Sequence, residues 1–234
     1  MKELILRIRM AAIFAMAGLA IFLAAGCAST KVVILAPEMA EERTKEPLLL
    51  LPPVASRPEL LSTASALGKY LNVEVPKRVS GTVTYGGNID SLKNIATWNN
   101  LIKNGSLNAS EMAAIGKTVG CNSVLGCQIL ELNPYPPFRM VNQYLWVDSE
   151  TGNVIARLYH DINLADSETN YRFKNYAGQG PAKQLYEAFF YSEDLYQTAY
   201  LMPEEFNRFS AAFSAAVLFE EARKIPWWLF WRSF

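Results

Sequence analysis

Apolar residues along the chain follow two periods, one typical of strands and one typical of helices. A continuous apolar run bounded by prolines, 47–53, predicts a buried central strand, because it is short for a helix. Between 59 and 70 the apolar positions recur at helical spacing, and Pro58 suits a first helical turn. A short strand is expected at 79–85, where Gly86-Gly87 forms a turn after it, and a second helix at 91–103, with Asn104-Gly105 as its C-terminal stop.

The middle of the chain is its most regular part. Asn108 offers an N-cap to a short helix that Gly120 ends. Runs rich in β-branched and aromatic residues then predict three strands, at 123–132, 138–147 and 154–164. The turn between the last two carries Gly152, which favours an antiparallel hairpin.

Two helices are expected near the end of the chain. One covers 184–190, and a longer one covers 203–224, with Pro203 and acidic residues in its first turn and basic residues in its last. An apolar stripe on the longer helix would bury against the sheet, through Phe206, Phe209, Phe213 and Val217. The pattern predicts one α/β (α+β) domain, in which helices, including a long C-terminal amphipathic helix, pack on a mixed, mainly antiparallel sheet.

The N-terminal segment has the parts of a secretory signal. Basic residues at 2–9 precede an apolar run, 10–23, which is shorter than the ~20 residues of a membrane-spanning helix. Small residues then lead into Cys27, a sequence that resembles the lipobox of bacterial lipoproteins. That resemblance implies three acyl chains on Cys27, and Ala28 implies the outer membrane. The alternative is an ordinary signal peptide that carries a cysteine near its end.

These patterns divide the chain into four parts. Residues 1–26 form a lipoprotein signal peptide, 27–46 a lipidated tether, 47–225 a single α/β domain and 226–234 an aromatic tail. Within the tether a short strand could form at 31–35, but Pro37 and the charged residues after it would break it, so we expect partial order there.

The net charge of the chain argues against one class of partner. The formal net charge is zero, and the basic signal residues are removed with the signal, so a nucleic-acid partner is not expected.

Cys121 and Cys127 are six positions apart, and Cys127 falls in a strand. Extended chain separates them by roughly 20 Å, too far for a disulfide. We expect both to be unpaired, with Cys127 buried.

Candidate catalytic groups are few. His160, the single histidine, shares its strand phase with Val154, Ala156 and Leu158, which indicates a hydrogen-bonded structural role in the core. Four glutamates lie at the ends of the 203–224 helix, where the helix dipole and solvation explain them: Glu204, Glu205, Glu220 and Glu221. The sequence contains no metal-ligand run, nucleotide loop or nucleophile elbow. We therefore expect no catalytic residue, no bound metal or cofactor, and no enzyme activity.

Two aromatic segments are candidates for interaction. Tyr135 lies in a proline-rich stretch, 134–138, which either presents a surface or forms a stiff connection between strands. Three of the five tryptophans lie in the last nine residues. This tail could lie at a membrane interface, anchor in a partner, or fold back onto the core, and its candidate residues are Trp227, Trp228, Phe230 and Trp231.

Three stretches carry a resemblance to bacterial envelope proteins. Residues 120–129 resemble the pattern GAD-x-VL-x-G-x-I, with Cys121 and Cys127 where the pattern has Ala and Gly. Residues 48–53 are similar to a "VLPF" strand, and 148–154 to a D-x-x-TG-x-V turn. These patterns occur in the curli secretion lipoprotein family, the TolB N-terminal domain and the lipoprotein activators of peptidoglycan synthases.

The resemblance implies a non-catalytic binding or assembly module within a larger cell-envelope complex. It would be lipid-anchored on the periplasmic face of the outer membrane, with an envelope protein or further copies of itself as partner. Two alternatives stay open: a ring-forming secretion-channel subunit, and a hydrolase that acts on envelope material.

Overall fold

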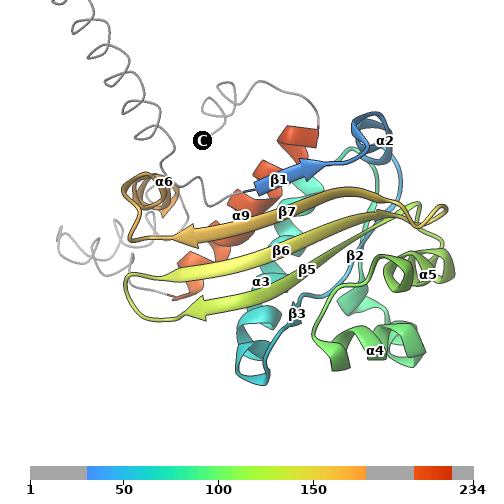
Figure 1. The fold of residues 1–234 in the computed structure, drawn as a ribbon, viewed down its shortest axis with the longest axis horizontal. Helices are drawn as coiled ribbons and strands as arrows, with labels where there is room; N and C mark the ends of the chain where they lie inside the picture. Colours follow the sequence, from blue (N-terminus) through green and yellow to red (C-terminus); the bar gives the residue numbers. More distant parts are fainter. Residues whose placement is uncertain (1–30, 178–202, 223–234) are drawn as a thin grey trace, which may run out of the picture.

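One seven-stranded sheet forms the middle layer of the computed structural model, which describes residues 31–177 and 203–222 (Figure 1). The strand order is β1-β7-β6-β5-β2-β4, and β3 also pairs with β5. The strands are β1 (Lys31–Ile34), β2 (Leu48–Leu50), β3 (Val54–Ala55), β4 (Val83–Tyr85), β5 (Ser123–Asn133), β6 (Arg139–Asp148) and β7 (Val154–Asn163).

The sheet has an antiparallel half and a parallel half. Strands β1, β7, β6 and β5 pair antiparallel, and β2 pairs parallel with both β5 and β4. The three long strands β5, β6 and β7 follow one another in sequence and carry the most extensive pairing. The predicted mixed, mainly antiparallel sheet is confirmed, including the hairpin between β6 and β7.

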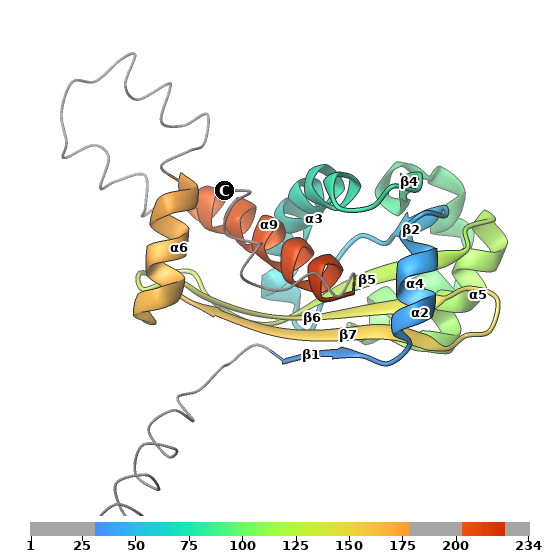
Figure 2. The same ribbon diagram turned by 90° about the horizontal axis from the view of Figure 1, so that it is seen from above.

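Helices cover both faces of the sheet. Figure 2 shows α3 and α9 next to each other along one side of it. On the opposite face, α4 and α5 pack against β2, β5 and β6. The helices are α2 (Pro37–Arg43), α3 (Leu61–Glu74), α4 (Ala96–Asn104), α5 (Ala109–Val119), α6 (Ser167–Ala177) and α9 (Pro203–Ala222).

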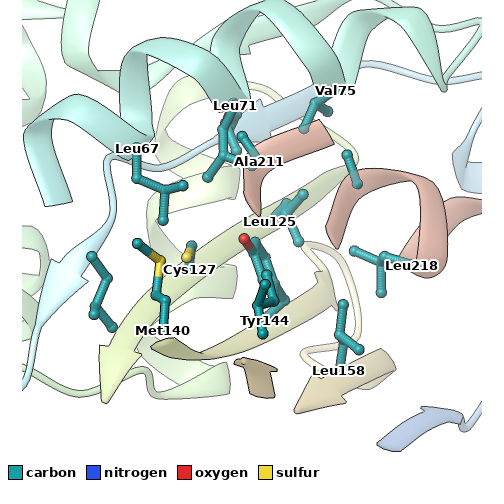
Figure 3. Packing of buried hydrophobic residues seen from close by; sticks show 14 of the residues in the cluster. Leu67, Leu71, Val75, Leu125, Cys127, Met140, Tyr144, Leu158, Ala211 and Leu218 are labelled. Carbon is teal, nitrogen blue, oxygen red and sulfur yellow. The ribbon is translucent and has the colours of Figure 1, made fainter. Parts of the chain in front are cut away.

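Strand β2 contributes side chains to two hydrophobic cores. Its side chains alternate between faces, so Leu48 and Leu50 enter the core under α3 and α9, while Leu49 enters the core under α4 and α5. Figure 3 shows the larger core, where side chains of α3 and α9 meet those of the sheet, among them Leu71, Ala211, Leu125 and Tyr144. The predicted buried central strand is confirmed, because all three leucines have no exposed surface.

The predicted start of α5 and the predicted C-terminal ends of α4 and α5 are also confirmed. The predicted start of α4 at residue 91 is wrong, because residues Asp90–Asn94 form a 3₁₀ helix and α4 begins at Ala96. The Asn108 side chain accepts hydrogen bonds from the amides of Ser110 and Glu111, at 3.0 and 3.3 Å. Gly105 ends α4 and Gly120 ends α5 with φ of 60° and 80°, in the left-handed region that favours glycine. Short-range capping signals therefore predicted the start of α5 and the C-terminal ends of both helices.

Helix α9 is buried beyond its predicted apolar stripe. Phe206 and Phe209 are buried, as predicted, while Phe213 and Val217 are only partly buried. Other positions around the helix are also buried, and most are small: Ser210, Ala211, Ala212, Ser214, Ala215 and Ala216. Small side chains bring α9 close to both α3 and the sheet, so the helix is enclosed on most of its circumference.

The segment from residue 31 to residue 46 corrects the predicted domain boundary. We expected residues 27–46 to be a tether, broken at Pro37. Instead β1 pairs antiparallel with β7, and the charged stretch after Pro37 forms α2, with Ala40 fully buried. Proline at the first helical position starts α2 rather than disrupting it. The folded domain therefore begins before residue 47.

A buried ion pair ties this segment to the β6–β7 turn. Arg43 Nε donates to Asp148 Oδ2 at 2.7 Å, and the Asp148 side chain has no exposed surface. Asp148 Oδ1 also accepts from the backbone amide and hydroxyl of Thr151, at 2.6 and 2.8 Å. Burial alone would raise the pKa of Asp148, but the hydrogen bonds from Thr151 and Arg43 outweigh it and hold the pKa below its usual value.

Replacing this carboxylate should destabilise the fold. We expect Asp148→Asn to lower the free energy of unfolding at pH 7 by about 3 kcal/mol, since it leaves Arg43 without its buried partner. Because the folded-state pKa is lowered, the stabilisation is present above about pH 4 and is lost as the pH falls below that value. Urea denaturation at pH 7 and at pH 3 measures both effects.

The matched control is Glu41→Gln, which removes the exposed pair between Glu41 and Lys45. It should change the free energy of unfolding by less than about 1 kcal/mol. Equal effects of the two substitutions at pH 7 would show that the Asp148 pair stabilises the fold no more than an exposed ion pair does.

Candidate functional site

Most of the predicted site residues lie outside the described part of the chain. Cys27 precedes it, and the aromatic tail follows it with Trp227, Trp228, Phe230 and Trp231. The predicted helix at 184–190 also lies outside the described residues. The roles predicted for these positions stay predictions.

Tyr135 is the predicted interaction residue that the structure describes. It lies between β5 and β6 with 74% of its surface exposed. Its amide donates to Asn133 Oδ1 at 3.3 Å, and the Asn133 side chain donates to the carbonyl of Pro137 at 3.0 Å. Phe138, at the end of the same stretch, is buried and stacks on Phe206 with ring centroids 5.3 Å apart. The connection is thus fixed in the core at one end while Tyr135 projects into solvent.

His160 lies in the core, as predicted, beneath helix α9. It has no exposed surface, its Nδ1 and Ser214 Oγ share a hydrogen bond of 2.8 Å, and its ring meets Phe213 edge-on at 4.6 Å. Burial lowers the pKa of His160 to about 3; the charge of Arg172 lowers it further, and Asp161 opposes the shift. A ring that stays neutral and enclosed is suited to holding α9 on the sheet.

One part of the predicted strand phase was wrong. Ala156 and Leu158 share the core of His160, but Val154 packs on the opposite face. The register between β6 and β7 shifts between Trp146 and Val147. The extra residue of a β-bulge at this point directs Val154, at the start of β7, to the opposite face of the sheet. A bulge adds one residue to one strand, so strict alternation cannot reveal it.

Further polar groups lie close to His160 on the same face of the sheet. The Tyr144 hydroxyl lies beside Cys127, Ser214 and Asn142, all of them buried. Within the part of the chain that is described, the Tyr144 hydroxyl, the Asn142 amide and His160 Nε2 have no well-aligned hydrogen-bond partner. Figure 3 shows Tyr144 and Cys127 inside this core. These groups are enclosed, so they present no surface to a substrate.

The cysteines behave as predicted. Cys121 and Cys127 are both free and buried. Burial raises the pKa of the Cys127 thiol to about 12. A thiol that stays protonated is a poor nucleophile, so Cys127 acts as a small core side chain.

Two of the glutamates of α9, one near each end, have partners in other elements. Glu204 accepts a hydrogen bond from the Tyr70 hydroxyl at 2.7 Å, which links α9 to α3. Glu220 pairs with Arg78 at 2.8 Å at the other end of the helix. The described residues contain no group of three or more His, Cys, Asp or Glu arranged to hold a metal ion. Nor does this part of the chain contain a helix long and apolar enough to cross a membrane.

A cavity of about 500 Å³ opens at the carboxyl ends of the parallel strands β2 and β4. Residues of α3, α4 and β3 contribute to its lining. Its lining comes from four parts of the chain: Pro52, Pro53, Val54, Ala55, Leu61, Ala64, Ser65, Lys69, Tyr85, Gly87, Asn88, Trp98 and Ile102. The sequence pattern did not indicate this site, because Gly86-Gly87 looked like an ordinary turn.

Glycines shape the wall around Tyr85. A Cβ at Gly68 would lie 2.5 Å from the Tyr85 hydroxyl, and a Cβ at Gly87 would lie 2.4 Å from its ring. Gly86 is similarly tight against Leu92, at 2.9 Å. The missing side chains let Tyr85 lie against α3, half-buried at the edge of the cavity, where burial raises its pKa.

Comparisons with known proteins identify no family for the chain. No family model matches it, and no curated protein sequence matches it. Solved structures give distant likenesses. The hypothetical protein CT253 from Chlamydia trachomatis has a TM-score of 0.38 and 11% identity, covering 73% of this chain and 94% of that one.

Two other similar structures come from different bacteria. The lipoprotein GNA1162 from Neisseria meningitidis has a TM-score of 0.36 and 15% identity, covering 53% of this chain and 88% of its own. The PelC dodecamer from Paraburkholderia phytofirmans has a TM-score of 0.33 and 10% identity, with coverages of 57% and 80%. Likenesses this weak assign neither a family nor a function.

The enclosed His160 gives a testable pH dependence. The unfolded chain binds a proton at this residue below about pH 6.5, whereas the folded chain does so only near pH 3. The free energy of unfolding should therefore fall, by about 1.4 kcal/mol per pH unit from this residue, as the pH drops below 6.5. Urea denaturation between pH 6.5 and pH 4.5 measures the slope, which should be flatter in His160→Gln.

Because the chain has one histidine, NMR provides a direct check. The imidazole C–H resonances should not move between pH 8 and pH 5. A titration with a midpoint near 6.5 would contradict the enclosed position of the ring.

Proposed function

We propose that the protein is a lipid-anchored module of a bacterial cell envelope that binds or assembles with other envelope components and catalyses no reaction. The observation that carries the proposal is the N-terminal pattern: a basic start, an apolar run and small residues before Cys27. Each acyl methylene buried in a bilayer contributes about 0.8 kcal/mol, so several chains on Cys27 would hold the protein on its membrane.

The resemblance to the curli secretion lipoprotein family, the TolB N-terminal domain and the activators of peptidoglycan synthases supports the assembly role. Its matching stretches are structural: 120–129 runs from the end of α5 into β5, and 148–154 forms the β6–β7 turn, which begins at Asp148. Ala28 favours the periplasmic face of the outer membrane over the inner membrane. The partner is either another envelope protein or further copies of the chain.

An exposed apolar face at the edge of the sheet also supports a binding role. Val33 and Leu35 point the same way from β1 and its end, and Tyr159 lies on that face of the neighbouring β7. Their surfaces are 48, 58 and 38% exposed. Helices α4 and α5 cover this face of the sheet only further along, over β5 and β6. The exposed Arg157, opposite Val33, lies on the same face, so apolar side chains and a positive charge occur together there. Exposed apolar side chains of this kind suit a contact with another protein.

Affinity purification from cross-linked membranes tests the proposal. We expect the wild-type chain to bring down a defined envelope protein, and Cys27→Ala to lose it, because the unanchored chain leaves the membrane where the partner is. Mass spectrometry of the purified complex is the measurement. If the wild-type chain is recovered alone, the assembly role is wrong.

Cys121→Ala is the matched control, since it removes a cysteine that cannot be the lipid attachment site. Labelling with an alkyne analogue of palmitate should mark the wild type and Cys121→Ala equally and leave Cys27→Ala unlabelled. Label on Cys27→Ala would show that the anchor is elsewhere.

Deleting 227–234 tests the aromatic tail separately. If the tail anchors in a partner, the partner should be lost from the purified complex, while the free energy of unfolding from urea denaturation stays within about 0.5 kcal/mol of the wild type. Lost stability with the partner still captured would show instead that the tail completes the core.

A further inference from the structure

The cavity at the ends of β2 and β4 occupies the position where α/β folds leave a gap. From β2 the chain passes to α3 on one face of the sheet, and from β4 it passes to α4 and α5 on the other face. No crossover segment therefore closes the space beyond the carboxyl ends of these two parallel strands. Open α/β sheets bind their ligands at this place.

The walls of the cavity suit an organic molecule. Trp98 is 5% exposed and forms one side, while prolines 52 and 53 and the ring of Tyr85 line the others. Proline rings and aromatic faces are rigid, so the shape of the cavity does not depend on mobile side chains. A volume of about 500 Å³ falls within the range of small-molecule sites, which are mostly apolar with a few polar groups.

The lining of the cavity carries positive charge and no negative charge. Lys69 is its single charged lining residue, and neither aspartate nor glutamate contributes to the lining. Lys69 is exposed, and among the described residues it forms no ion pair or side-chain hydrogen bond. Other cations of the domain are already paired, for example Lys77 with Glu74 and Arg139 with Asp161. Lys69 is thus free to neutralise an anion that arrives with a ligand.

We propose that this cavity binds a small carboxylate with an apolar body. The apolar body lies against Trp98 and the two prolines, and the carboxylate lies beside Lys69. Ser65 and Asn88 add hydrogen-bonding groups to the lining. The site lies within the folded domain and does not depend on the acyl chains of Cys27, so it goes beyond the proposed assembly role.

Two probes that differ in charge alone test the proposal on the lipidated full chain in lipid nanodiscs. They are 4-(4-fluorophenyl)butanoate and its neutral amide, with ¹⁹F NMR line widths as readout and empty nanodiscs subtracted. We expect the acid to bind with a dissociation constant on the order of 1 mM. It should bind about fivefold more tightly than the amide, because it alone pairs with Lys69.

Variants separate the charge from the cavity. Lys69→Met should remove the preference for the acid, and Lys103→Met, which alters an exposed lysine of α4 outside the lining, should keep it. Ser65→Phe places a ring in the cavity from an exposed helical position and should abolish binding of both probes. Ser62→Phe puts the same ring on α3 outside the lining and should bind both as the wild type does.

Equal binding of acid and amide to the wild type would overturn the proposed ligand class. Wild-type binding by Ser65→Phe, or its loss in Ser62→Phe, would overturn the site. If Ser65→Phe fails to fold, the Trp98 indole N–H resonance, assigned through Trp98→Phe, answers the same question in the wild type. It shifts on titration with the acid if the cavity is occupied, and an unchanged resonance overturns the proposal. None of these results depends on whether an envelope partner is captured.

Discussion

The burial of both faces of β2 is the constraint on which the rest of the structure depends. Its leucines alternate between two cores, and each fully buried leucine stabilises the fold by roughly 1.5–3 kcal/mol. A strand buried on both faces needs helices on both sides of the sheet. The chain meets this need by sending α3 to one face and α4 with α5 to the other, and this division leaves the cavity at the strand ends.

Helix α9 completes the larger core from a distant part of the sequence. It lies against α3 and β7, and its small residues allow close approach over most of its surface. Within that contact, His160 meets Ser214, and Glu204 meets Tyr70. A buried polar group that loses its partner costs about 1–3 kcal/mol, so the buried His160–Ser214 pair disfavours any packing of α9 that is shifted along the sheet. The Tyr70–Glu204 hydrogen bond is exposed and contributes less. The apolar contacts hold the helix on the sheet, and the polar pairs specify its position.

The strand β1 and helix α2 change how the proposed anchor relates to the domain. A tether of residues 27–46 would have separated the membrane and the fold by a long flexible segment. With β1 beginning at Lys31, only residues 28–30 lie between Cys27 and the sheet. A chain spans at most about 3.5 Å per residue, so the anchor would keep β1 within roughly 10–15 Å of the lipid. The exposed apolar side chains of Val33 and Leu35 would then lie near the membrane surface, where an envelope partner would meet them.

The sequence by itself determined the elements that depend on local chemistry. Asn108, Gly105 and Gly120 mark helix ends through their own backbone and side-chain preferences, and the strands 123–132, 138–147 and 154–164 follow from their residue types. The inward position of His160 followed from alternation. The proposed localisation of the protein likewise comes from the linear pattern before Cys27, which the described structure does not include.

Only the tertiary structure decided the features that join distant segments. The pairing of β1 with β7 and the Arg43–Asp148 contact were hidden, because a proline and a charged run predict a break unless the partner surface is known. The cavity was hidden for the same reason. Its lining comes from β3, α3, β4 and α4, and no local pattern reports that Lys69, Tyr85 and Trp98 surround one space. Contacts of this kind depend on how the helices divide between the two faces of the sheet. That division is set by packing among segments from the whole chain, so no single segment reveals it.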